Sequence, residues 1–344
     1  MKNILRHSVF FAVLLSMVAS SCADRADKSV PRSFRNEVVL KTTPVKDQGS
    51  SELCWAYAML ATIETERLEM GDSVNLSPDY LARLWLQDQA RACFLTRGRV
   101  GVSLRGMAPM ALRLIERYGM EPYDSYHPLG SISYRSLSRA AMQVARASRS
   151  LRMLDTRLGS MLDRQIGYLP PTLFMLGVGY TPQEFAQSVY VEGDYVALTS
   201  FTHHPFGKAF VMEAADNRML DTFYNIPLDS LMKTIVSCLR HGHPVCWEGD
   251  VSESGFNFRR GCATLPDERH TPTQAERQRA FEQFQTTDDH CMELCGLARD
   301  ANGRLYFIAK NSWGTGNAYR GFMYLSYNYV RMKTIAIVVR NGEL

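Results

Sequence analysis

The sequence predicts an α+β protein in two lobes with a cleft between them. Two observations carry this prediction: the segments between residues 52 and 165 have the spacing and end signals of helices, and those from about 195 onward have the texture of strands. Among 344 residues, 46% are hydrophobic and 22% charged, which excludes a disordered chain, a collagen-like chain and a coiled-coil rod. The net charge of +4 is too small to indicate a dedicated nucleic-acid binder.

Three helices are predicted in the first third of the chain. Residues 52–70 form the first, and residues 79–90 form the second, which follows Ser77 as N-cap and Pro78 at the first helical position. The third covers residues 108–118 and ends at a glycine.

Residues 135–165 contain seven arginines and a helical stripe of leucines from Leu151 to Leu162. This pattern fits either a patch for nucleic acid or another anionic surface, or a helical hairpin with a basic, solvated outer face. We favour the hairpin, because no aromatic residues interleave with the arginines.

The second half of the chain alternates short apolar runs with turn signals. Residues 300–303 (DANG) form a turn that predicts a hairpin between two of the strands. The predicted strands cover residues 209–214, 244–247, 291–298, 305–310, 321–326 and 334–339.

The amino terminus has the pattern of an export signal. A positive start precedes the apolar run of residues 8–19, which is too short to span a bilayer, and small residues then lead to Cys22. This resembles a bacterial lipoprotein signal, so we expect residues 1–21 to be removed and Cys22 to carry a lipid that anchors the protein to a membrane. Ordinary signal cleavage near the same place is the alternative, and both place the protein outside the cytoplasm. Residues 22–37 are expected to be a short polar lead.

The residues before the first predicted helix indicate nucleophilic chemistry. Cys54 lies in the first turn of that helix, where the helix dipole favours the thiolate, which is the nucleophilic form. Six residues earlier, the side-chain NH₂ of Gln48 is suited to bind an oxyanion together with the backbone N–H of Cys54. Cys54 alone is also consistent with a buried structural cysteine.

A second group of residues favours catalysis over that alternative. His290 opens one predicted strand, and Asn311 ends the next, so a hairpin would bring them to neighbouring strand ends. Asn311 can then accept a hydrogen bond from one imidazole nitrogen while the other faces the thiol. Trp313 can cover this pair from water. Cys291 and Cys295 next to His290 faintly suggest zinc, but no second ligand pair has the spacing, so we expect no metal and no cofactor.

The blocks at residues 46–57 (KDQGSSELCWAY) and 310–316 (KNSWGTG) resemble the two signature blocks of the papain-like cysteine peptidases. The resemblance implies a papain-like fold and peptide substrates. It implies Cys54 as nucleophile, His290 as general base and acid, Asn311 as the residue that orients it, and Gln48 as oxyanion donor. It also places Gly106 on the substrate-binding ridge.

A narrower resemblance is to the bleomycin hydrolase or aminopeptidase C branch. Ser51 stands where papain has a disulfide cysteine, and residues 201–207, 224–228 and 246–251 look like the middle of that branch. The resemblance implies a peptidase domain at residues 38–344 with a helical insertion at about 131–190, and aminopeptidase activity.

Two departures from the family leave alternatives open. Glu52 replaces the usual glycine two residues before the cysteine, and we expect it to raise the thiol pKa, obstruct the substrate or bind its amino group. We expect the C-terminal arm that enforces aminopeptidase action in the branch to be missing, which favours an endopeptidase. A non-catalytic peptide-binding relative is a further alternative. The sequence does not indicate an oligomeric state.

Overall fold

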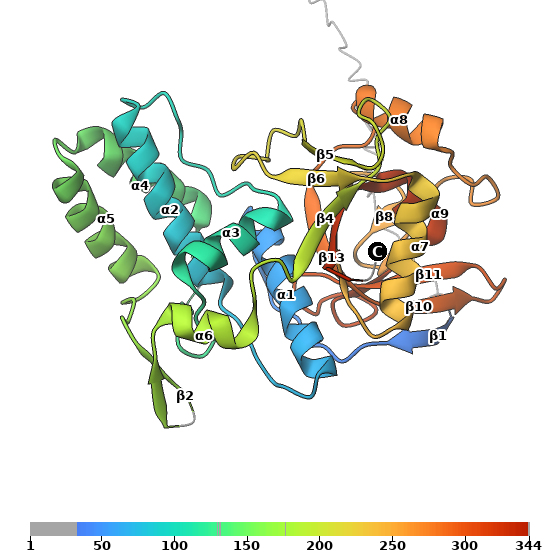
Figure 1. The fold of residues 1–344 in the computed structure, drawn as a ribbon, viewed down its shortest axis with the longest axis horizontal. Helices are drawn as coiled ribbons and strands as arrows, with labels where there is room; N and C mark the ends of the chain where they lie inside the picture. The colour runs from blue at the N-terminus through green and yellow to red at the C-terminus, as the bar shows by residue number, and fades with distance from the viewer. Residues whose placement is uncertain (1–32, 129, 131, 176, 343–344) are drawn as a thin grey trace, which may run out of the picture. The chain divides into compact units, whose positions relative to one another are not determined.

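A computed structural model describes residues 33–342, except 129, 131 and 176, so the predicted signal and Cys22 lie outside the described residues. The helices, drawn in Figure 1, are α1 (Cys54–Glu69), α2 (Pro78–Leu95), α3 (Ala108–Tyr118), α4 (Tyr134–Ala147), α5 (Leu151–Gln165), α6 (Pro182–Val189), α7 (Leu228–Arg240), α8 (Gln274–Glu282) and α9 (Tyr327–Lys333). The strands are β1 (Phe34–Val39), β2 (Leu173–Met175), β3 (Val178–Tyr180), β4 (Tyr195–Thr199), β5 (Lys208–Val211), β6 (Thr222–Asn225), β7 (Val245–Gly249), β8 (Phe256–Asn257), β9 (Cys262–Ala263), β10 (His290–Asp300), β11 (Leu305–Lys310), β12 (Phe322–Ser326) and β13 (Thr334–Arg340).

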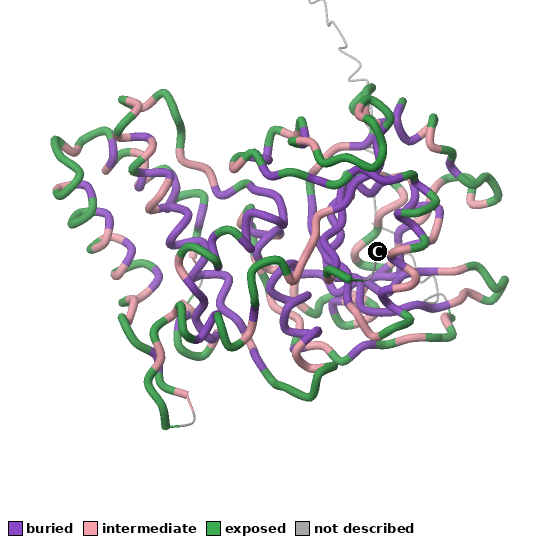
Figure 2. Tube along the Cα trace, in the orientation of Figure 1, coloured by how far each residue is buried: buried purple, intermediate pink, exposed green. Residues whose placement is uncertain are grey.

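The described chain has the predicted division into a helical first half and a β-rich second half. Helices α2 to α6 gather on one side of α1, and the large sheet with α7, α8 and α9 lies on the other (Figure 1). The sheet has the order β5-β6-β4-β13-β7-β10-β11-β12-β9-β8, and β1 pairs with β10 outside this path. Its central strands are buried, as Figure 2 shows. The α+β prediction is confirmed.

Helix α1 is the central element between these two groups. It packs against β10 on one side and α3 on the other, and the buried residues of α1 therefore lie on most of its circumference. They include the polar Thr62, Glu64, Thr65 and Glu66.

The structure confirms the predicted start of the second helix and both predicted ends of the third. The Ser77 hydroxyl accepts the N–H of Tyr80 at 3.1 Å, and Pro78 is the first residue of α2. The helix continues to Leu95, five residues beyond the predicted end. Helix α3 has the predicted bounds, and Gly119 ends it with φ of 84°, a left-handed conformation that favours glycine.

Residues 135–165 form the predicted helical hairpin. The buried residues Leu154, Leu158 and Leu162 of α5 face the lobe core, whereas Leu151 at the start of the helix is exposed. None of the helices in the described part of the chain combines the length and apolar character needed to cross a membrane.

Two further predicted boundaries are wrong. Phe34–Val39 is the strand β1, although we expected a polar lead to residue 37; the Phe34 ring stacks on Tyr324 with centroids 4.0 Å apart, which ties this segment to the sheet. The predicted strand at 209–214 ends at Val211. There the Asn217 side chain donates to the Met212 carbonyl at 3.0 Å, satisfying it outside the ladder.

Candidate active site

A cleft of about 480 Å³ lies where the start of α1 meets the start of β10. Six of the seven site residues predicted for the described chain line it: Gln48, Glu52, Cys54, Gly106, His290 and Trp313. The seventh, Asn311, lies behind His290 and is buried.

Cys54 is the first residue of α1, and Leu53 before it provides no side-chain cap. The positive end of the helix dipole therefore acts directly on the sulfur. A hydrogen bond with the Cys291 side chain holds the pKa of the Cys54 thiol well below its ordinary value, and hydrogen bonding and charge from His290 add to this, while burial opposes it. The thiolate is thus the favoured form of Cys54.

His290 and Asn311 are neighbours because β10 and β11 form the predicted antiparallel hairpin. The His290 Nε2 lies 2.8 Å from the Asn311 Oδ1. That same oxygen accepts the backbone N–H of Ser312 at 2.7 Å, which fixes the amide with its oxygen toward the imidazole. The His290 Nε2 therefore carries the hydrogen of this bond, and Nδ1 is left for the thiol.

Trp313 covers the imidazole. The ring centroids of His290 and Trp313 are 4.6 Å apart, and the rings of Phe256 and Phe258 meet the indole edge to face at 5.8 and 5.3 Å. His290 is 3% exposed and Asn311 is 2% exposed. Little water reaches the hydrogen bond between them, which strengthens it.

Gln48 is held on three sides. Its Nε2 donates to the Ser51 carbonyl at 2.7 Å, its Oε1 accepts from the Ser312 hydroxyl at 2.5 Å, and its backbone N–H donates to the Ser312 carbonyl at 2.8 Å. These bonds fix the amide of Gln48, which lines the cleft. One of the two Nε2 hydrogens has no partner among these bonds, so it is available to an oxyanion.

Gly106 stands where the neighbouring Met110 side chain leaves no space for a Cβ. A Cβ at this position would lie 1.9 Å from the Met110 Cε and 3.4 Å from the Trp55 Cε2, so any other residue would displace the Met110 side chain. The glycine lets the backbone itself form this part of the cleft wall.

Glu52 is exposed in the cleft near Arg105. Burial alone would lower the pKa of Arg105, but its hydrogen bond to Asp216 at 2.8 Å and the charges of Asp216, Glu52 and Asp288 raise it. Part of the Glu52 charge is therefore balanced by a guanidinium.

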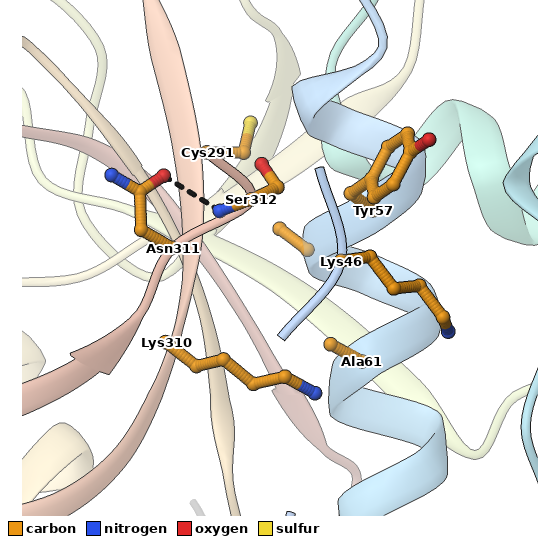
Figure 3. A pocket seen from close by; sticks show the side chains of 8 residues that line it. Lys46, Tyr57, Ala61, Cys291, Lys310, Asn311 and Ser312 are labelled. Carbon is orange, nitrogen blue, oxygen red and sulfur yellow. Dashed lines mark hydrogen bonds between the residues drawn. The ribbon is translucent and has the colours of Figure 1, made fainter. Parts of the chain in front are cut away.

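A buried ionic network fastens the 46–52 loop to α1. The Lys46 Nζ lies 2.6 Å from the Glu64 Oε1, which also accepts the Leu76 N–H at 2.6 Å. The Thr43 hydroxyl donates to Glu64 and accepts from the Lys310 Nζ at 2.8 Å. Figure 3 shows Lys310, directly before Asn311, extending toward α1 beside a small cavity. The network connects the segments that carry the predicted nucleophile, oxyanion donor and orienting residue.

Among the residues that line the cleft, Glu248 and Asp288 were not singled out from the sequence, and Cys291 was considered only as a zinc ligand. The Cys291 Sγ lies 3.4 Å from the Glu248 Oε1, while Asp288 precedes His290 by two residues. A signal for Glu248 exists, since it is a carboxylate inside the apolar run at 245–249, where a buried strand is expected to be uncharged.

A cluster outside the cleft has potential metal ligands. The ligand atoms of His203, His204 and Glu213 lie within 4.8 Å of one another. However, the Gln278 Oε1 accepts the Thr202 N–H at 2.6 Å, so its Nε2 donates to the His203 Nδ1 at 3.0 Å. The proton of neutral His203 then sits on Nε2, toward Glu213. This favours histidine–glutamate hydrogen bonds over a metal site.

Comparisons with known proteins agree with this geometry. Residues 174–344 match the Peptidase C1-like family. Aminopeptidase G of Lactobacillus delbrueckii subsp. lactis is 22% identical, with 95% of this chain and 87% of the relative covered. The mitochondrial cysteine proteinase 1 of Saccharomyces cerevisiae is 24% identical, covering 93% and 79%. The crystal structure of PepW from Lactobacillus rhamnosis has a TM-score of 0.71 at 17% identity, covering 91% of this chain and 83% of that one.

The fold and these matches define a papain-like cysteine peptidase. Within that class, the similarity to Aminopeptidase G and to cysteine proteinase 1 supports the aminopeptidase C branch.

Proposed function

We propose that the protein is an exported thiol aminopeptidase that cleaves peptide bonds through Cys54, His290 and Asn311. The observation that carries the mechanism is the 2.8 Å bond between the His290 Nε2 and Asn311, which leaves Nδ1 to the thiol of Cys54. The lowered pKa of Cys54, caused first by its hydrogen bond with Cys291 and further by His290, supports the same assignment.

The reaction follows from these positions. The Cys54 thiolate attacks the peptide carbonyl carbon, and the oxyanion that forms is bound by the Gln48 Nε2–H and the Cys54 backbone N–H. The protonated His290 Nδ1 gives its proton to the leaving amine as the C–N bond breaks, and a thioester remains. Water, deprotonated by the same Nδ1, then releases the acid and regenerates the thiolate.

Aminopeptidase action is proposed over endopeptidase action because Aminopeptidase G is among the relatives and because the cleft is acidic. An acidic cleft attracts the charged amine of a free amino terminus. Export through residues 1–21 and a lipid anchor on Cys22 remain part of the proposal, supported by the charge and apolar pattern of that segment.

The test is Cys54→Ser in the purified protein. Peptide turnover should be lost while the thermal unfolding curve is unchanged, because the serine hydroxyl is not ionised by this pair. Cys93→Ala is the matched control, since Cys93 lies buried in α2 and does not line the cleft. Unchanged turnover in Cys54→Ser would refute the mechanism.

A further inference from the structure

The wall of the cleft around Cys54 is strongly acidic. Its described lining contains a single arginine, Arg105, which hydrogen-bonds to a carboxylate of the same wall. The lining residues with carboxyl groups are Glu52, Asp216, Glu248, Asp288 and Asp289. Glu248 and Asp288 differ from the other three because each has a buried carboxylate oxygen that lacks a hydrogen-bond donor among the described residues.

Glu248 lies on β7, between β10 and β13 in the middle of the sheet, and is 1% exposed. Its Oε1 lies 3.4 Å from the Cys291 Sγ, whose single hydrogen can be donated either to this oxygen or to the Cys54 thiolate. Its Oε2 is buried and has no hydrogen-bond donor among the described residues. Burying a carboxylate oxygen without a donor reduces the stability of the fold unless another group donates a hydrogen bond to it.

Asp288 supplies the second such oxygen. Its Oδ2 is also buried and lacks a donor in the described part of the chain. Burial first, and then the negative charge of Asp288, raises the pKa of Glu248 well above its ordinary value. Burial likewise raises the pKa of Asp288 well above its ordinary value. The protonated form of both groups is therefore favoured in the free protein.

This pair is poorly explained as a structural feature. Buried carboxyl groups that lack a cationic partner contribute little or nothing to folding. Instead, the pair lines the cleft of the predicted nucleophile, and it is near enough for the charge of Cys54 to raise the pKa of both carboxyl groups, after the larger effect of burial.

We propose that Glu248 and Asp288 form an ammonium subsite that binds a positively charged amine of the peptide's acyl part, the part that becomes bonded to Cys54. The inference rests on the peptidase function proposed above. The ammonium N–H groups donate to the Glu248 Oε2 and the Asp288 Oδ2, and protons held by these carboxyl groups leave to solvent. The amine is either the free α-amino group or a lysine side chain, because both offer the same donors and charge.

The experiment uses three substrates with one amide-linked reporter and different acyl parts: methionyl with a free amine, N-acetyl-lysyl and N-acetyl-methionyl. The wild type should cleave an ammonium-bearing substrate with kcat/KM at least tenfold above that for N-acetyl-methionyl. Preference for free methionyl identifies the α-amino group, and preference for N-acetyl-lysyl identifies the side chain. Glu248→Gln and Asp288→Asn should each reduce the preference tenfold or more, chiefly through KM.

Control variants show whether a loss of the substrate preference comes from this subsite or from another change in the protein. Glu52→Gln removes an exposed carboxylate of the same cleft and should reduce the preference much less. Equal losses on all three substrates in Glu248→Gln and Asp288→Asn would show a structural role and overturn the subsite. The same conclusion follows if only Glu52→Gln removes the preference. Asp288 lies before β10 rather than inside a strand, so we expect Asp288→Asn to fold even if Glu248→Gln does not. The subsite can then still be tested with Asp288→Asn.

Failure of the peptidase function has a different signature. If the wild type cleaves none of the three substrates although iodoacetamide alkylates Cys54 fully, the proposed function falls, and the subsite falls with it. If the wild type cleaves all three equally, the peptidase function stands and only the subsite is refuted.

Discussion

The position of Gln48 gives the sharpest test of the site. Its amide is fixed by the Ser51 carbonyl and the Ser312 hydroxyl, and one Nε2 hydrogen remains for the oxyanion. Removing one oxyanion donor costs about 2.7–4 kcal/mol in the transition state. Gln48→Ala should therefore lower kcat by roughly 10²–10³ with little change in KM.

Ser312→Ala provides a graded comparison. This variant keeps the Gln48 donor but removes the 2.5 Å bond that orients it. A single intramolecular hydrogen bond contributes about 0.5–1.5 kcal/mol, so kcat should fall by about tenfold at most.

The assay measures kcat and KM on a reporter peptide beside the rate of iodoacetamide alkylation at one pH. Alkylation forms no oxyanion, so its rate should stay near that of the wild type in Gln48→Ala. A rise in KM alone would show that Gln48 binds the ground state. A larger loss in Ser312→Ala than in Gln48→Ala would show that the Ser312 hydroxyl acts in another way.

Three further predictions concern the thiol, the buried network and the amino terminus. Cys291→Ala removes the largest influence that lowers the Cys54 pKa, so alkylation at pH 6 should slow by about tenfold, and an unchanged pH profile would contradict this. Glu64→Ala leaves the Lys46 ammonium, whose side chain is 15% exposed, without its carboxylate partner and should cost up to about 3–5 kcal/mol in urea unfolding, whereas a loss below about 1 kcal/mol would count against the network. Labelling with a palmitate analogue should mark the wild type but not Cys22→Ala; equal labelling, or none, leaves simple secretion.

The sequence predicts the fold best where local signals decide the structure. The cap at Ser77, the glycine after α3 and the turn at residues 300–303 mark element ends through chemistry that needs no distant partner. The strand β1 was missed, because what fixes it is the packing of Phe34 on Tyr324, 290 residues away in the chain. No local pattern contains that contact.

The same distinction applies to the site. Cys54 and Gln48 lie six residues apart in one loop, and His290 and Asn311 flank one hairpin, so their proximity follows from short-range structure. Glu248 meets Cys291 because β7 pairs with β10, with these two residues directly opposite each other. That register joins positions 43 residues apart in sequence and is set by the whole sheet, so the acidic part of the cleft could not be derived from the sequence.

The acidic wall of the cleft opposes the formation of the Cys54 thiolate that the proposed reaction needs. Carboxylates near Cys54 disfavour its charged form, whereas the helix dipole, Cys291 and His290 favour it. Burial favours the protonated form of Glu248 and Asp288 in the free protein, which limits the negative charge that Cys54 faces there. When an ammonium group enters the subsite, the carboxyl groups release protons, and the positive charge of the ammonium offsets negative charge that they gain. Substrate binding can therefore satisfy both buried oxygens while the ammonium limits the added negative charge beside Cys54.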